Sequence, residues 1–164
     1  MRAMIATLTL LLAACGFQPV YAPAGGGQAI GPVQVAQIDG KAGHVLKREL
    51  DRILAVEGGD APPMTLEITL LERVRRLGIR VDESATRAEL RLTANYVLTP
   101  PGGSGRPMRG SVSTVVNYDI PTAAFGEIAA QDDARERAAE TMAQRFRAEL
   151  ALRIAQAREA GRLR

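Results

Sequence analysis

Three long runs of alternating apolar and polar residues, between Met64 and Asp119, most constrain what this chain can fold into. In the middle run, residues 87–99, apolar side chains occupy every even position from Ala88 to Leu98. Successive side chains of a β-strand point to opposite faces of its sheet, so this alternation predicts a strand with one buried and one solvated face. Three consecutive strands joined by loops predict an antiparallel meander.

The two neighbouring runs follow the same pattern, with one irregularity. From Met64 to Leu70 every second residue is apolar, but Glu72 then falls at an apolar position and the apolar residues change side. A β-bulge would produce this shift, and so would a strand that runs past the edge of the layer covering it. We expect a strand over residues 64–81, a turn over residues 82–86, a loop over residues 100–107 and a strand over residues 108–119.

Two segments with helical periodicity flank the predicted meander. Residues 41–56 place apolar side chains on one side of a helix, and charged side chains and the solvated His44 on the other. After Pro121 a short helical segment over residues 122–130 is expected to lead into a main helix over residues 132–160. Its predicted buried stripe comprises Ala139, Met142, Ala143, Phe146, Leu150 and Ile154, with Leu152 lying off the stripe.

A further strand, over residues 33–38, is predicted before the first helix, because Val33 and Val35 alternate with Gln34. The element order is therefore β-α-β-β-β-α. Amphipathic helices and a sheet with one apolar face bury each other. The sequence predicts an α+β fold in which two amphipathic helices pack on one face of a mixed four-stranded sheet, whose other face stays polar.

The N-terminus has the layout of a secretory signal. Arg2 precedes an apolar run over residues 3–14, which at about a dozen residues is shorter than the ~20 that span a bilayer. The run ends in Leu-Ala-Ala directly before Cys15, the only cysteine, and this pattern resembles the bacterial lipobox. We expect residues 1–14 to be a removed lipoprotein signal peptide and Cys15 to carry the lipid. Residues 15–32, rich in Pro and Gly, are then a flexible tether, and residues 33–164 a single domain.

Composition and motifs indicate a noncatalytic protein. The net charge of +3 is too small to imply nucleic acid, and the low aromatic content of 4% argues against a surface that stacks bases. The Ser104 region departs from the nucleophile-elbow pattern, and no phosphate-binding Gly-rich loop precedes a Lys-Ser or Lys-Thr pair. One histidine and one acylated cysteine cannot build a zinc site. We therefore expect no enzymatic activity, no cofactor and no metal.

Arginines are the residues that stand out in and around the meander. A solvated sheet face with charged edges would carry such residues, and so would a patch that binds phosphate-bearing or carboxylate-bearing partners. Because several fall on the polar face or at loop ends, we expect them to lie near one another. The set comprises Arg73, Arg75, Arg76, Arg80, Arg87, Arg91, Arg106 and Arg109.

The opening of the predicted mature chain, Cys15-Gly16-Phe17, resembles that of the LPS-assembly lipoproteins, the LptE family, in which glycine and an aromatic residue follow the acylated cysteine. The element order over the whole mature chain is similar, and the amphipathic helix after residues 134–139 resembles the C-terminal helix of the family. The resemblance implies a lipid-anchored protein on the periplasmic side of the outer membrane. Gly16 agrees with this location, because Asp after the cysteine is the usual signal for retention in the inner membrane.

The same resemblance implies partners and a binding site. Family members plug the lumen of the LPS-assembly β-barrel, help to assemble it, and aid delivery of lipopolysaccharide to the cell surface. They are reported to bind lipopolysaccharide through basic residues, one of them near the turn after the first meander strand. Arg80 matches that position most closely and Arg87 next, and Arg91 completes the candidate set. The alternative is a periplasmic adaptor lipoprotein of a transport system, which binds protein rather than lipopolysaccharide.

Overall fold

The computed structural model describes residues 30–55, 62–79, 85–103 and 105–163. The expected signal peptide, Cys15, most of the expected tether, Arg80 and most of the expected 82–86 turn lie outside the described residues. The elements in chain order are β1 (Val33–Val35), α2 (Lys41–Ala55), β2 (Met64–Ile79), β3 (Ala85–Thr99), the short 3₁₀ helix η1 (Pro101–Gly103), β4 (Met108–Asp119) and α3 (Ala124–Glu159).

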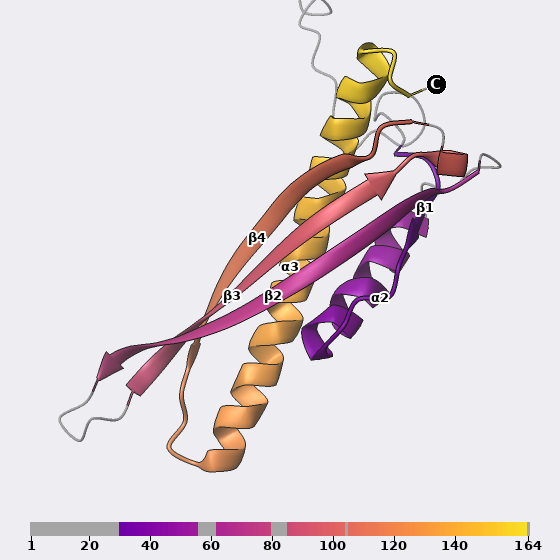
Figure 1. The fold of residues 1–164 in the computed structure, drawn as a ribbon. Helices are drawn as coiled ribbons and strands as arrows, with labels where there is room; N and C mark the ends of the chain where they lie inside the picture. The colour runs from indigo at the N-terminus through magenta and orange to yellow at the C-terminus, as the bar shows by residue number, and fades with distance from the viewer. Residues whose placement is uncertain (1–29, 56–61, 80–84, 104, 164) are drawn as a thin grey trace, which may run out of the picture.

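The predicted α+β fold is confirmed. The strands form one sheet in the order β1-β2-β3-β4, with β1 parallel to β2 and the other two pairs antiparallel. Both helices lie on the same side of this sheet, and α3 runs along most of its length (Figure 1). The opposite side of the sheet carries no helix, as the alternation predicts (Figure 1).

The core lies between the sheet and the two helices. The even positions of β3 from Ala88 to Leu98 are nearly inaccessible to solvent, as are the predicted stripe residues of α3. Phe146 of α3 packs edge-on against Tyr96 of β3, with ring centroids 5.5 Å apart. Buried alanines, among them Ala138 and Ala139, lie along the same stripe. Leu152 is exposed, as expected from its position off the stripe.

Several helix and strand boundaries differ from the predictions; β3, for example, begins at Ala85, inside the turn expected over residues 82–86. The segment over residues 122–130 is not separate, because α3 is one continuous helix of 36 residues. Asp132 does not start a new helix there; its carboxylate accepts a hydrogen bond from Arg135 one turn later. β1 ends at Val35, whereas the prediction extended to residue 38, although the Ala36 N–H still donates to the Leu66 carbonyl. Ile30, in the expected tether, is buried in the core.

The irregularity in β2 has its explanation in the length of the strand. The pairing of β2 with β3 keeps one register from Thr65–Thr99 to Ile79–Ala85, so the bulge alternative is wrong. The second half of β2 instead extends beyond the apolar layer, toward the end of the sheet where α3 begins (Figure 1). Glu72 keeps its place on the helix-covered face, where it bonds to Arg135 of α3.

Candidate functional site

The candidate site is the face of the sheet that carries no helix, which we call the open face. It consists of the odd-numbered residues of β2, β3 and β4, such as Thr69, Asn95 and Asn117, which are exposed. Toward the end of the sheet that β1 joins lies a hollow of 560 Å³, lined by residues that include Glu67, Asn95 and Arg109. The open face therefore offers a broad polar surface rather than a closed cavity.

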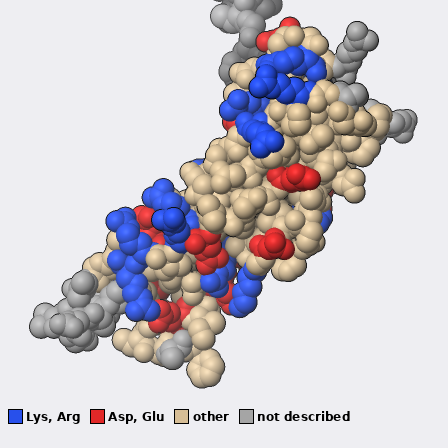
Figure 2. Space-filling model, viewed as in Figure 1, with Lys and Arg blue, Asp and Glu red and all other residues tan. Residues whose placement is uncertain are grey.

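Four arginines gather on the open face at the end nearest the β2–β3 connection, and we call them the distal cluster. They are Arg73, Arg75, Arg87 and Arg91. The register sets their arrangement, because Arg73 lies directly opposite Arg91, Arg75 opposite Glu89, and Arg87 opposite Asp119 on β4. Figure 2 shows basic side chains collected over this part of the sheet.

Two carboxylates partly neutralise the distal cluster. Glu89 accepts hydrogen bonds from Arg75 and Arg91, each at 3.3 Å, and Asp119 accepts one from Arg87 at 3.3 Å. Burial would raise the pKa of Glu89, but the hydrogen bonds and positive charges of Arg75 and Arg91 outweigh it and lower that pKa below its usual value. Among the described residues Arg73 has no acidic partner and faces another cation. The distal cluster therefore keeps an excess of positive charge.

The predicted binding residues are brought together only in part. Arg87 and Arg91 lie on the same face of β3, four residues apart, whereas Arg80 lies outside the described residues. Arg73 and Arg75 belong to the same patch but were not among the predicted ligand residues. The hairpin register brings them there, and a register cannot be assigned until the connection between two strands is known.

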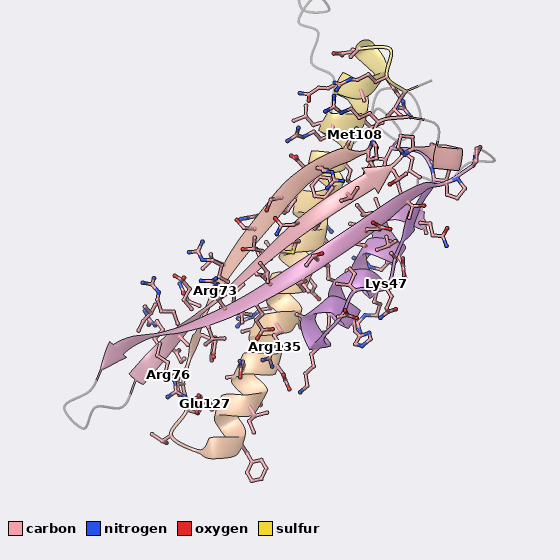
Figure 3. All side chains as sticks on the ribbon, in the orientation of Figure 1. Lys47, Arg73, Arg76, Met108, Glu127 and Arg135 are labelled. Carbon is pink, nitrogen blue, oxygen red and sulfur yellow. The ribbon has the colours of Figure 1, made fainter. Side chains whose placement is uncertain are left out.

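The predicted arginine set is only partly gathered in one place. Arg76 points to the helix-covered side, where its guanidinium bonds Glu127 of α3 at 2.8 Å (Figure 3). Arg109 lies opposite Val97, six residues along β3 from Arg91, which is about 20 Å in an extended strand. The set therefore divides between the distal cluster, the helix-covered side and the opposite end of the sheet.

Ion pairs between α3 and β2 support the distal end from the helix-covered side. Arg135 donates one bifurcated hydrogen bond through Nε to the two carboxylate oxygens of Glu72, at 2.9 and 3.1 Å, and another through Nη1 to Asp132 at 2.6 Å. The Arg135 side chain is only 19% exposed, so these contacts are better shielded from water than a surface pair. The hydrogen bond to Glu72 raises the pKa of Arg135, and the hydrogen bond from Arg135 lowers that of Asp132.

The described part of the chain contains no group of three or more His, Cys, Asp or Glu side chains placed to hold a metal ion. His44 is exposed on α2, where its ring lies 3.3 Å from the Gln37 amide. Within the same described ranges, neither α2 nor α3 has an apolar stretch of membrane-spanning length.

Comparison with known proteins identifies the family of the chain. The family model LptE, described as lipopolysaccharide-assembly, matches residues 29–150. The chain belongs to the LptE family. This match covers β1, α2, the whole meander and most of α3, so the open face and the distal cluster both lie within it. No curated protein matches the chain in sequence.

Solved structures share the fold. A putative lipoprotein from Caulobacter crescentus CB15 is 27% identical, with a TM-score of 0.61, and the match covers 79% of this chain and 93% of that one. A minor lipoprotein from Acinetobacter baumannii is 16% identical, with a TM-score of 0.53, over 74% of this chain and 95% of that one. The second likeness concerns the fold alone.

Proposed function

We propose that this protein is an outer-membrane lipoprotein that plugs the LPS-assembly β-barrel, helps to assemble it, and aids delivery of lipopolysaccharide to the cell surface. The observation that carries the proposal is the LptE family match over residues 29–150. The one-sided sheet supports it, because the lumen of a large β-barrel is polar and the open face presents polar side chains. In this role the protein acts by binding, with no catalytic residue and no cofactor.

The membrane attachment is proposed to be the lipidated Cys15. Residues 1–14 are then the removed signal peptide, and the tether is the part of residues 15–32 that precedes Ile30, because Ile30 is already buried in the core of the domain predicted over residues 33–164. Fourteen residues lie between Cys15 and Ile30, the first described residue, which allows a reach of up to about 50 Å. Two or three acyl chains hold a protein at a bilayer almost permanently, because each buried methylene contributes ~0.8 kcal/mol. The domain is proposed to face the periplasm.

Lipopolysaccharide is proposed to contact the distal cluster through Arg87 and Arg91, together with Arg80. The surplus positive charge beside Arg73 supports this, because guanidinium groups form paired hydrogen bonds with phosphate and carboxylate groups. We expect the double variant Arg87→Gln/Arg91→Gln to lose most of its affinity for lipopolysaccharide. The control Arg48→Gln removes an exposed arginine of α2, which pairs with Glu136, and should bind as the unmodified protein does.

Extraction with a mild detergent and mass spectrometry test the proposal. The expected result is a triacylated or diacylated Cys15 and co-purification with an outer-membrane β-barrel. A Cys15→Ser variant should instead be released from the membrane, while the control Gln144→Ser, at an exposed position of α3, should stay attached. A mature protein with an unmodified thiol, free in the periplasm, would contradict the anchor. Capture of inner-membrane transporter subunits alone would favour the adaptor alternative.

A further inference from the structure

A hollow of 220 Å³ lies at the end of the molecule opposite the distal cluster, and four arginines line it. Arg106 belongs to the loop before β4, Arg109 to β4, Arg153 to α3, and Arg162 to the segment that follows α3. We call this the C-terminal pocket. Figure 2 shows basic side chains surrounding a depression at this end, beside the last turns of α3.

The chain after α3 is held in place, which positions Arg162. Gly161 has a φ of 65°, a left-handed conformation that glycine adopts without strain. The Arg162 N–H donates to the Ala157 carbonyl at 2.8 Å, and Leu163 packs against the core. These contacts form a helix C-cap with its usual hydrophobic contact. The backbone beside the pocket is therefore ordered by hydrogen bonds and apolar packing.

A hydrogen-bonded network also positions Arg153. Its Nε donates to Glu149 at 2.9 Å, and the Tyr96 hydroxyl donates to the same carboxylate oxygen at 3.1 Å. Tyr96 is anchored in the core by Phe146. The Glu149 carboxylate therefore holds Arg153 in place and is itself held by Tyr96.

The charges of the C-terminal pocket are not balanced. Within the described ranges, no acidic side chain pairs with Arg106, Arg109 or Arg162, so of the four pocket arginines only Arg153 has a carboxylate partner, Glu149. The partial negative charge of the carbonyl groups at the C-terminus of α3 accounts for basic side chains in the last turn of that helix. It does not account for Arg106 and Arg109, which come from the loop before β4 and from β4 itself. Cations gathered in one hollow repel each other, and a bound anion would relieve that repulsion.

We infer that the C-terminal pocket binds a phosphate monoester. A terminal phosphoryl group carries nearly two negative charges and three acceptor oxygens, which suits several guanidinium forks better than a carboxylate or a phosphodiester does. The pocket volume equals that of about seven water molecules at ~30 Å³ each, so it holds the phosphoryl group and the first atoms of its carrier. Both a lipid headgroup and a soluble phosphate compound have this chemistry.

This site is separate from the proposed function. It lies at the other end of the open face from Arg87 and Arg91, and Arg153 and Arg162 fall beyond residue 150, where the family match ends. The pocket also lies beside the start of the described chain, since Arg158 of the same helical end approaches Gly31. A phosphate monoester at a membrane surface would therefore be within reach of a chain anchored at Cys15.

The test titrates the full chain, in nonionic detergent, with inorganic phosphate and follows the side-chain NMR signals of the pocket arginines. We expect saturable shifts, and a loss of affinity of about tenfold or more in Arg109→Gln/Arg162→Gln. The matched control Arg137→Gln/Arg48→Gln removes two exposed arginines far from the pocket and should change the affinity by less than about twofold. Circular dichroism checks that all variants are folded.

Two further titrations distinguish the sources of the phosphate. Micelles containing phosphatidic acid should bind more tightly than inorganic phosphate if the ligand is a lipid headgroup, and equally if it is a soluble compound. Both results support the site. Absence of saturable shifts, an equal loss in the control variant, or equal binding of phosphatidylglycerol, a phosphodiester, would overturn it. Co-purification of the β-barrel is measured separately, so either proposal can fail alone.

Discussion

The two halves of β2 lie in one strand and pair with one neighbour, yet different forces hold them. In the first half Leu66 is fully buried beneath the helices, whereas in the second half Val74, on the same face of the strand, is 41% exposed. There the strand is tied to α3 by ion pairs, from Glu72 to Arg135 and from Arg76 to Glu127. The first half therefore stabilises the domain by apolar burial, while the second half projects a charged surface with little apolar support.

Truncating one apolar side chain of the helix-covered face in each half of β2 tests this contrast most strongly. Leu66→Ala should lower the free energy of unfolding by about 2–5 kcal/mol, because it leaves a cavity in a packed core. Val74→Ala, at a half-exposed position on the same face of the second half, should lower it by less than about 1 kcal/mol. Urea denaturation of both variants measures the difference. Equal effects would mean that the two halves are packed alike.

Removing the ion pair between Arg135 of α3 and Glu72 of β2 should lower the free energy of unfolding by a smaller amount, and the change in structure should be confined to the second half of β2. Arg135→Met should cost about 1–2 kcal/mol, since hydrogen bonds to charged groups are lost at a partly shielded site. Hydrogen exchange should increase in the second half of β2 more than in the first. The exposed arginine of the control Arg137→Met pairs with Asp133 within α3, so exchange in β2 should be unchanged there. Uniformly faster exchange over β2 would contradict a local tie.

The stability of the first half of β2 should fall at alkaline pH, because Tyr96 of β3, which lies opposite Ile68, is buried. Burial, followed by the charge of Glu149, raises the pKa of Tyr96 from 10.0 to about 12. The folded state favours the protonated phenol, so its stabilisation is complete below pH 10 and is lost as the pH rises toward 12. Phenolate absorbance should show a late-titrating tyrosine that is missing in Tyr96→Phe. A late titration that persists in this variant would assign the effect elsewhere, for example to Tyr118, whose pKa burial also raises.

The smallest expected effect concerns the like charges of the distal cluster. Arg73→Gln removes a cation that faces Arg91 across the strand pair. It should raise the free energy of unfolding by about 0.2–1 kcal/mol. The gain should shrink with added salt, because both side chains are exposed to screening ions. Thermal unfolding at low and high salt measures it. A loss of stability at low salt would mean that Arg73 has an attractive partner.

The sequence predicts the fold wherever the signal is local. In β3 each even residue is apolar, so its buried face is evident from the alternation alone, and the stripe from Ala139 to Ile154 likewise identifies the buried face of α3. Glu72 could not be explained locally, because its partner Arg135 lies 63 residues further along the chain. The uninterrupted course of α3 was missed for a related reason: Asp132 resembles a helix start, but its carboxylate is bound by Arg135 and Lys41.

The candidate site was less predictable than the fold. The sequence indicates that Arg87 and Arg91 share the polar face, but the pairing of Arg73 with Arg91 follows only from the hairpin register. The C-terminal pocket depends on contacts between β4 and the end of α3, more than 40 residues apart in sequence, which no local pattern reveals. Charge clusters that form by long-range packing therefore cannot be predicted from local sequence patterns.

Site-specific photo-crosslinking in cells tests the central claim, that the open face meets a larger partner. A photoreactive residue at Asn95 or Asn117, both exposed on this face, should capture an outer-membrane β-barrel, and unirradiated cells provide the control. The account predicts the β-barrel at both positions. Capture of inner-membrane transporter subunits alone, or of no protein at either position, would contradict it.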